Sequence, residues 1–415
     1  MRFPRTTVGI DLSPMRCSRA AGYPILLALT AGLCRGQIRE ATLEELPERL
    51  RDAQWLAEIE QSTTRRVRDG EWDHVVYYAL QSRRFTELPP VEPGESAWQW
   101  KKQGRLPDDA AARLHAFVAA RADGPRHAAM RAMVWDEAQL KLEYARAMHF
   151  LYEKEWASRE REGAARREYV AALYQRRGHS TDTDVTSGYG VHTGLEVLTA
   201  LRPGTRIRRV LLVGPGLDWA PRMSLDEDTP PQSLQPYALA DSLVRLGLAA
   251  ADDLRVDCVD VNPRVVTYLN GFAGGARRLW LRETPGDSEW RHYFLALGKA
   301  TGTRKGMEIA VPSHVAKGIG AWRMNVLTQR VTDGDYDLAV ATNVLLYFND
   351  RELGLALANI AHALRPGGHF LHNEPRPASE AWGRELGMPA VHARTVHFAA
   401  GGEFFDSVVL HELRK

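Results

Sequence analysis

Residues 336–374, YDLAVATNVLLYFNDRELGLALANIAHALRPGGHFLHNE, place a helical pattern between two short apolar runs. The first run, Asp337 to Ala341, is apolar enough for a buried strand and ends at Thr342 and Asn343. Leucine and isoleucine then recur at the spacing of one helix face, and the second run ends at Glu374. Two strands joined by a helix are typical of a parallel pair with a crossover connection.

Strand patterns also lie on both sides of this unit. Val210 to Val213 form an apolar run that breaks at GPG, residues 214–216, and residues 254–260, LRVDCVD, form another. Downstream, residues 394–400 and 406–413 flank a glycine-containing turn and predict an antiparallel hairpin. Strands that alternate with helical patterns predict an α/β domain with a parallel sheet.

The residues that end these strands indicate a ligand site. Gly214 and Gly216 have no side chain, so the backbone there can approach a ligand closely. Asp260 ends the next strand, where a carboxylate can accept hydrogen bonds from both hydroxyls of a ribose. A structural role, capping a turn with Asn262, stays open for Asp260. Trp219 stands where a dinucleotide fingerprint needs its third glycine, which disfavours a nicotinamide-dependent oxidoreductase.

From about residue 205 to the end, the chain resembles the class I S-adenosylmethionine-dependent methyltransferases. QPYALADSL (235–243), the Asn-Val-Leu at 325–327, NVLLYF (343–348) and ALRPGGHFL (363–371) are similar to stretches of the CheR-type chemotaxis methyltransferases. The resemblance implies a Rossmann-like seven-stranded α/β sheet with a C-terminal antiparallel hairpin, preceded by a mainly helical region. It also implies S-adenosyl-L-methionine as the cofactor.

The resemblance assigns a role to individual residues. Gly214 and Gly216 would face the methionine part of the cofactor, and Asp260 its ribose. The other implied cofactor contacts are Asn325 and Val326 at the adenine and Asn343 near the methyl group. Tyr347 would lie beside the sulfonium, where the ring attracts the cation and the hydroxyl orients a nucleophile. Both Tyr347 and Glu374 are predicted catalytic residues; a plain core position for Tyr347 and a loop salt bridge for Glu374 stay open.

The methyl acceptor, a small molecule or a protein, is not identified by the sequence. Two arginines typical of the CheR type have no counterpart: none stands in residues 184–198, and Thr342 occupies the position before NVLLYF. Both losses weaken the case for a receptor glutamate as acceptor. The alternative function is a non-catalytic, methyltransferase-like scaffold whose helical region binds a partner.

Three regions are expected along the chain: a signal-like or anchor-like segment over 1–37, a helical region over 38–195 and the methyltransferase domain over 196–415. Two apolar stripes predict amphipathic helices in the second region, one over 43–53 and one over 133–151. The insertion over 270–318 is expected to be an added hairpin, with a substrate cap as the alternative.

The first segment favours one of two locations. Residues 23–34, YPILLALTAGLC, follow two arginines and have the layout of a secretory signal peptide over 15–36, too short to span a bilayer. A buried helix is the other interpretation. Use of the cofactor would favour the cytoplasm, whereas the segment favours export or an N-terminal membrane association. No membrane span is expected elsewhere.

Charge and cysteine content exclude other classes. Lys and Arg number 54 against 52 Asp and Glu among 415 residues, a net charge of +2, which gives no footprint for nucleic acid. The three cysteines are too scattered for a disulfide framework or a zinc cluster. We therefore expect neither a nucleic-acid partner nor a metal.

Overall fold

A computed structural model describes most of the chain from residue 38 onward. The described residues are 38–121, 123–134, 136–183, 185–219, 229–271, 277–281, 286, 288, 290–398 and 405–414. The signal-like segment over 1–37 lies outside them. No helix in the described ranges has the length and apolar character needed to cross a bilayer, and no cluster of His, Cys, Asp and Glu there could hold a metal ion.

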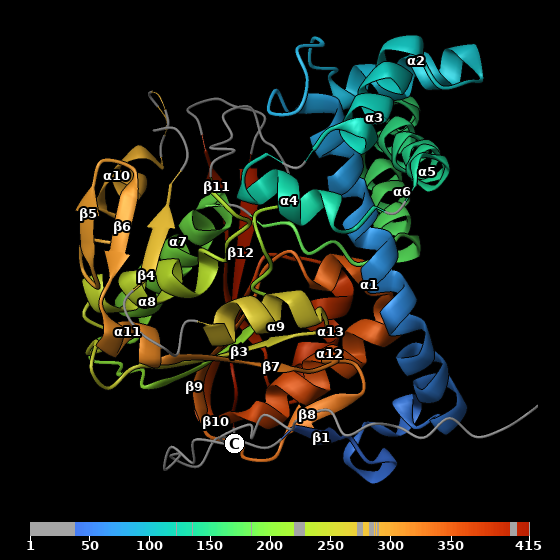
Figure 1. Cartoon of the computed structure of the whole chain (residues 1–415). Helices are drawn as coiled ribbons and strands as arrows, with labels where there is room; N and C mark the ends of the chain where they lie inside the picture. Colours follow the sequence, from blue (N-terminus) through green and yellow to red (C-terminus); the bar gives the residue numbers. More distant parts are fainter. Residues whose placement is uncertain are drawn as a thin grey trace, which may run out of the picture. The chain divides into compact units, whose positions relative to one another are not determined.

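A seven-stranded sheet forms the centre of the fold (Figure 1). Its order is β11-β12-β10-β9-β2-β3-β7. The strands are β2 (Arg209–Val213), β3 (Arg255–Asp260), β7 (Ile319–Arg323), β9 (Tyr336–Ala341), β10 (Leu364–His372), β11 (Ala390–His397) and β12 (Phe405–Glu412). β12 pairs antiparallel with both β10 and β11, whereas the pairs from β10 to β7 are parallel. The predicted Rossmann-like sheet with its antiparallel hairpin is therefore confirmed.

Helices cover both faces of this sheet because its strands carry apolar side chains on each side. Val210 and Leu212 belong to one hydrophobic cluster, and Leu211 and Val213 to the other. The first cluster includes residues of α7 (Val185–Leu201), α8 (Gln235–Arg245) and α9 (Pro263–Asn270). The second includes residues of α12 (Asp350–Ala363) and α13 (Pro377–Glu385). Successive strand residues point to opposite faces, and this alternation builds the three layers.

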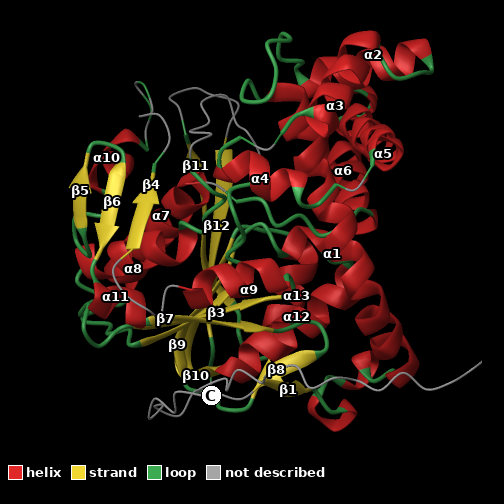
Figure 2. Cartoon of the chain, viewed as in Figure 1, coloured by secondary structure: helices red, strands yellow, loops and turns green. Residues whose placement is uncertain are grey.

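The region before the sheet is mainly helical, as predicted (Figure 2). It contains α1 (Ala53–Gln81), α2 (Pro93–Gln103), α3 (Asp108–Ala119), α4 (Pro125–Arg131), α5 (Glu137–Glu155), the 3-10 helix η3 (Ala157–Glu160) and α6 (Gly163–Arg176). The stripe over 133–151 lies largely on α5. The helix expected over 43–53 is wrong: two 3-10 turns, η1 (Leu43–Glu45) and η2 (Glu48–Leu50), flank Pro47, which cannot continue a helix. Before them, β1 (Ile38–Glu40) pairs with β8 (Gln329–Val331).

The boundary predicted after residue 195 falls inside α7, which packs against α8 and β12. Residues from Gln37 onward form one compact unit. The division into a helical and a methyltransferase domain stays a prediction, and in the structure α7 packs with the sheet.

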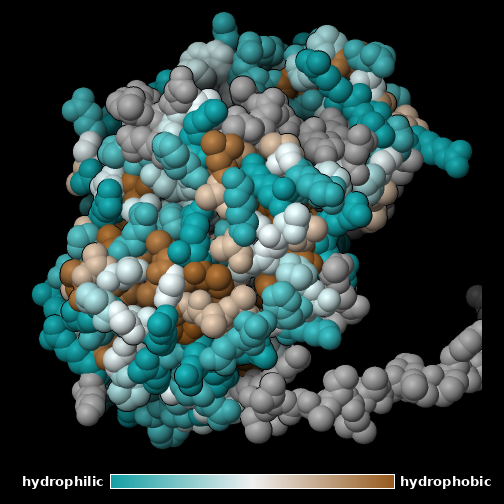
Figure 3. Space-filling model, turned by 90° about the vertical axis from the view of Figure 1, so that its left-hand side faces the viewer, coloured by the Kyte–Doolittle hydropathy of each residue, from teal (hydrophilic) through white to brown (hydrophobic). Residues whose placement is uncertain are grey.

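The insertion forms a small antiparallel sheet of its own rather than one hairpin. Its order is β4-β6-β5, with β4 (Arg277–Trp280), β5 (Thr303–Lys305) and β6 (Glu308–Val311). The helices α10 (Arg291–Ala296) and α11 (Ser313–Lys317) accompany it. Figure 3 shows the side of the molecule where these elements lie in Figure 1, and hydrophobic residues gather in the middle of that face. Leu295 of α10 is among the exposed hydrophobic residues.

Candidate functional site

A cavity lies at the carboxyl ends of β2, β3 and β9 and beside the loop after β7. It contains about 690 Å³ of space free of protein atoms, part of which is open to solvent. Seven of the eight predicted site residues line it: Gly214, Gly216, Asp260, Asn325, Val326, Asn343 and Tyr347. The sequence therefore identified residues that meet in one place although they span 134 positions. Ligands of open α/β sheets bind at this edge of the strands.

The glycine turn after β2 has a backbone that only glycine adopts without strain. Gly214 and Gly216 both have a φ of +66°. A Cβ on Gly214 would overlap the side chain of Val344, and a Cβ on Gly216 would overlap the carbonyl of Thr181. The turn therefore exposes bare backbone to the cavity on one side and packs against its neighbours on the other.

Asp260 is the last residue of β3, and its carboxyl group is buried. Burial makes the charged form of this group unfavourable. Burial raises its pKa to about 7, although backbone N–H groups of Asn262 and Gly216 hydrogen-bond the carboxylate and act in the opposite direction. The Asn262 N–H lies 2.8 Å from Oδ1. Asp260 therefore does cap the turn that begins at Asn262, and it lines the cavity as well.

Asn325 uses its side chain to hold α1 in place. Its Nδ2 donates to Glu60 at 2.8 Å and to Thr63 at 3.0 Å, and its Oδ1 accepts from the Leu327 N–H at 3.1 Å. The contact to adenine that the resemblance implies for Asn325 and Val326 stays a prediction. Since the Asn325 amide is already engaged, Asn325 shapes the wall by fixing α1 over the strand ends.

Asn343 follows β9 in a left-handed conformation, with a φ of +59°, which asparagine tolerates better than most residues. It exchanges two hydrogen bonds with Asn373, which follows β10: the Asn343 N–H donates at 2.9 Å and its Oδ1 accepts at 2.8 Å. This pair ties the ends of two neighbouring strands together and holds Asn343 at the cavity.

Tyr347 lies in the short 3-10 helix η5 (Leu345–Tyr347) and is 8% exposed. Burial raises the pKa of its hydroxyl, and hydrogen bonds with Ser180 act in the opposite direction. The ring packs against His179 at 5.6 Å and edge-on against Tyr174 at 6.0 Å between centroids. Tyr347 is thus both a packed residue and a wall of the cavity.

Glu374 is the predicted residue that does not line the cavity. It lies two residues beyond β10 and forms an ion pair with Arg376 at 3.3 Å. Burial raises the pKa of Glu374, with Arg376 acting in the opposite direction and Asp406 adding to the rise. The geometry matches the loop salt bridge, and a catalytic role for Glu374 stays a prediction.

The sequence did not identify one wall of the cavity, the segment 178–183 between α6 and α7. Leu217 after the glycine turn exchanges backbone hydrogen bonds with it, from its N–H to Thr181 at 2.7 Å and from the Thr183 N–H to its carbonyl at 3.0 Å. Five residues of the segment line the cavity: His179, Ser180, Thr181, Asp182 and Thr183. Small polar residues between two helical patterns were the available signal, but it did not indicate what the segment covers.

Two polar atoms of this segment lack a partner among the described residues. His179 Nε2 and Thr181 Oγ1 are buried and make no hydrogen bond. Burial and the nearby Arg66 lower the pKa of His179 to about 3, so its ring is neutral. Buried polar atoms normally have partners, and both residues line the cavity.

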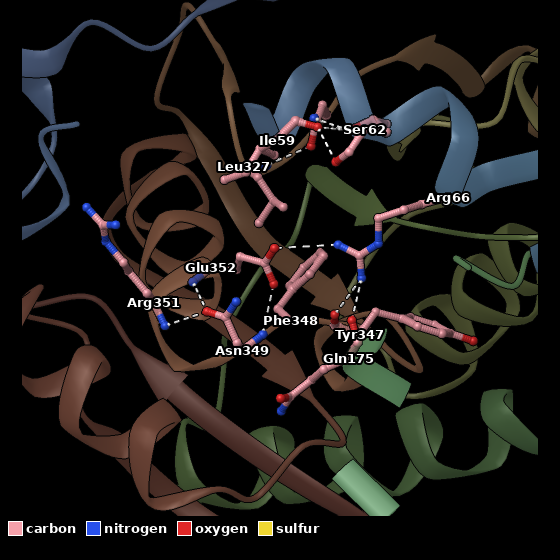
Figure 4. A network of polar contacts seen from close by, with 12 residues as sticks. Ile59, Ser62, Arg66, Gln175, Leu327, Tyr347, Phe348, Asn349, Arg351 and Glu352 are labelled. Carbon is pink, nitrogen blue, oxygen red and sulfur yellow. Dashed lines mark hydrogen bonds and ion pairs between the residues drawn. The ribbon is translucent and has the colours of Figure 1, made fainter. Parts of the chain in front are cut away.

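Helix α1 crosses the strand ends and fixes this segment. His74 Nε2 lies 2.7 Å from Ser180 Oγ, and the His179 N–H donates to the Arg66 carbonyl at 2.7 Å. Figure 4 shows the Arg66 side chain reaching from α1 to the carbonyls of Gln175 and Tyr347 and to Glu352. Helix α1 therefore holds the residues that form this wall of the cavity in place.

The lining fits a ligand that carries a nucleoside. The Asp260 carboxyl can accept hydrogen bonds from sugar hydroxyls, and the glycine turn offers bare backbone. Apolar side chains provide faces for a base, namely Val213, Val259, Val261, Met324 and Phe348. His179 and Thr181, each with one polar atom that has no partner among the described residues, line the same cavity.

No protein-family model matches the chain, and no curated protein matches it. Among similar solved structures, N-methyltransferase NodS from Bradyrhizobium japonicum, in complex with S-adenosyl-L-homocysteine, is 13% identical, and the match covers 54% of this chain and 87% of that one, with a TM-score of 0.29. A TehB-like SAM-dependent methyltransferase from Corynebacterium glutamicum is 14% identical, with coverages of 64% and 98% and a TM-score of 0.30. Magnesium protoporphyrin IX methyltransferase from Synechocystis with bound SAM is 12% identical, with coverages of 56% and 82% and a TM-score of 0.31. At this level of similarity, function has to be inferred from the geometry of the chain itself.

Proposed function

We propose that this protein is an S-adenosylmethionine-dependent methyltransferase. The observation that carries the proposal is the meeting of Gly214, Gly216, Asp260, Asn343 and Tyr347 in one cavity at the carboxyl ends of parallel strands. They are the positions to which the resemblance to class I methyltransferases assigns cofactor contacts and the residue beside the sulfonium. Any open parallel sheet brings its strand ends together, so the support comes from the combination of residue types at this edge: a glycine turn, a buried carboxyl group and an aromatic ring.

Different residues of the chain bind different parts of the cofactor. Asp260 accepts hydrogen bonds from the ribose hydroxyls, and the backbone at Gly214 and Gly216 lies along the methionine part. His179 Nε2 and Thr181 Oγ1 gain partners that they lack among the described residues. When bound, the cofactor supplies a methyl group on a sulfonium, which a nucleophile can attack directly.

The catalytic contribution of the chain is positioning. Tyr347 and Asn343 lie on the same short segment after β9 and are held by Ser180 and Asn373 respectively. Methyl transfer requires an in-line approach of the nucleophile, and a fixed geometry is worth several orders of magnitude in rate. The electron-rich face of Tyr347 also stabilises a nearby cation.

The finer likeness to CheR-type enzymes would make a protein carboxylate the acceptor. Thr342 argues against that choice, since its hydroxyl is buried and accepts a hydrogen bond from Gln235 Nε2 at 2.5 Å. CheR-type enzymes have an arginine at this position, whereas this chain has a neutral hydroxyl that is already hydrogen-bonded. We therefore propose that the methyl acceptor is not a receptor glutamate.

Calorimetric titration with S-adenosylmethionine and S-adenosylhomocysteine tests the proposal. We expect both to bind, and we expect Asp260→Ala to weaken binding by about 1–3 kcal/mol, the cost of a lost hydrogen bond to a charged group. Asp252→Ala, at a side chain that is 90% exposed, is the matched control. Absence of binding to the unsubstituted protein would remove the proposal. Binding without transfer to any component of a cell extract would favour the scaffold.

A further inference from the structure

A second, larger cavity adjoins the first on the side of the helical region. It contains about 1830 Å³ of space free of protein atoms, part of which is open to solvent. Residues of α1, α2, α5 and α6 line it, together with the segment 177–182. Four residues line both cavities: Ser180, Asp182, Asn343 and Tyr347. A molecule in the second cavity can therefore reach a ligand in the first at this junction.

Six side chains of Tyr, Trp and Phe line the second cavity. The set comprises Tyr77, Trp98, Phe150, Trp156, Tyr174 and Tyr347. Trp98 and Trp156 have ring centroids 5.0 Å apart, and Phe150 packs edge-on against Tyr174 at 5.4 Å. Trp98 is 44% exposed, which leaves a large flat surface open to a ligand. Rings arranged around an open space favour a planar ligand that can stack on them.

Guanidinium groups of the chain already occupy faces of these rings. Arg177 lies over Phe150 at 4.0 Å and forms an ion pair with Asp73, while Arg159 lies over Trp156 at 4.8 Å. A cationic ligand would meet positive charge at the very rings that attract cations. Carboxylates line the same cavity, namely those of Glu92, Glu95, Glu155 and Asp182, so an anionic ligand would meet negative charge. A neutral aromatic ligand avoids both kinds of repulsion and can stack on the rings and on the guanidinium planes.

Asp182 is the carboxylate that lines both cavities among the residues described. Its backbone N–H donates to Ser180 Oγ at 3.3 Å, within the segment that packs on the glycine turn. A carboxylate at the junction can accept a hydrogen bond from an O–H or N–H nucleophile and then take its proton.

Resting on the methyltransferase function proposed above, we propose that the second cavity binds a planar, neutral aromatic acceptor with its O–H or N–H group at Asp182. The oxygen or nitrogen lone pair forms the new bond to the methyl carbon. The carbon–sulfur bond breaks, and its electron pair goes to sulfur, which turns the sulfonium into a neutral thioether. The proton passes to Asp182 and then to solvent.

Calorimetry with 2-naphthol and its saturated, non-planar counterpart decahydro-2-naphthol tests the acceptor class. Both titrations are done in the presence of saturating S-adenosylhomocysteine. We expect the dissociation constant of 2-naphthol to be about tenfold lower than that of decahydro-2-naphthol, which is the upper end of what one aromatic pair contributes. Trp98→Ala should remove most of this preference and leave S-adenosylhomocysteine binding unchanged. Leu142→Ala, at an exposed residue of α5 outside both cavities, is the control.

The two proposals fail in different ways. If S-adenosylhomocysteine binds and 2-naphthol shows no preference over its saturated counterpart, the aromatic acceptor is wrong. If 2-naphthol binds with that preference and S-adenosylhomocysteine does not, the methyltransferase function is wrong and the aromatic site remains.

Transfer itself tests Asp182. We expect the wild-type protein to form 2-methoxynaphthalene. The Asp182→Asn protein should react more slowly at neutral pH, and its rate should recover when the pH is high enough to ionise 2-naphthol itself. Equal rates at neutral pH would contradict the role of Asp182. Absence of product from a protein that binds both compounds would overturn the acceptor assignment.

Discussion

Gly70 in the middle of α1 and Gly178 before α7 pack backbone against backbone. A Cβ on Gly70 would overlap the carbonyl of His179, and a Cβ on Gly178 would overlap the backbone of Gly70 and of Arg66. Glycine inside a long helix costs about 0.5–1 kcal/mol relative to alanine, so the close approach explains its presence. Through this contact α1 fixes the segment that covers the glycine turn.

Gly70→Ala should therefore destabilise the protein although alanine is the better helix former. Overpacking of a close contact costs about 1–3 kcal/mol, which exceeds the helix-propensity gain. Denaturant unfolding measures the difference. Gly94→Ala is the matched control, because no atom lies within 4 Å of the Cβ position in α2. A Gly70→Ala protein as stable as wild type would show that the segment moves away freely.

Arg66→Met should lower stability and cofactor affinity together. Arg66 donates to Gln175 at 3.1 Å and to Tyr347 at 3.0 Å, and it lies 3.5 Å from Glu352. Removal leaves partly buried acceptors without a donor, which costs about 1–3 kcal/mol for each one that water cannot reach.

Arg68→Met is the control for this change, since the Arg68 side chain is 62% exposed and forms an ion pair with the neighbouring Asp69. Unfolding curves and titration with S-adenosylhomocysteine give the two readouts. An Arg66→Met protein with unchanged affinity would mean that the position of η5 does not depend on α1.

The stability of the protein should depend on pH through Asp260. Burial raises its pKa from the ordinary value of 3.8 to about 7 in the folded chain. The folded state therefore holds the proton more tightly than the unfolded state, so the contribution of Asp260 is fully present below pH 3.8 and is lost as the pH rises through 7. A difference of one in pKa corresponds to about 1.4 kcal/mol, so the free energy of unfolding falls by at most about 4 kcal/mol.

Asp260→Asn removes this titration. The free energy of unfolding of the variant, relative to wild type, should rise between about pH 4 and 7 and stay level above that range. Urea unfolding at a series of pH values measures it, with Asp252→Asn as the exposed control. Parallel curves for wild type and Asp260→Asn would contradict the raised pKa. A carboxyl group that destabilises the ligand-free fold at neutral pH is typical of a residue kept for binding.

The strands and their last residues could be predicted because the signal is local. A continuous apolar run such as Val210–Val213 is typical of a buried strand, and parallel strands bring their carboxyl ends to one edge. Gly214, Asp260 and Asn343 lie at the ends of such runs or within two residues of them, so placing the strands also placed the site.

The cover of the site could not be predicted in the same way. Segment 178–183 forms backbone hydrogen bonds with Leu217, and α1 reaches it through Gly70; neither contact leaves a periodic pattern. The strand β7 (IGAWR) was missed as well, because a glycine and an arginine interrupt its apolar character. Pro47 was an available signal against a helix over 43–53, and the leucine spacing was given more weight.

Tyr347→Phe separates binding from positioning. The ring and its packing against His179 and Tyr174 are retained, so we expect the dissociation constant of S-adenosylhomocysteine to change by less than about twofold. The hydroxyl and its hydrogen bonds with Ser180 are lost, and with them one group that orients a nucleophile at the junction of the two cavities. Transfer of radiolabelled methyl groups should fall about tenfold, which corresponds to about 1.4 kcal/mol of barrier. Tyr336→Phe, at a buried tyrosine that bonds Asp257 away from both cavities, controls for loss of a buried hydroxyl. An undiminished rate in Tyr347→Phe would return that hydroxyl to a purely structural role.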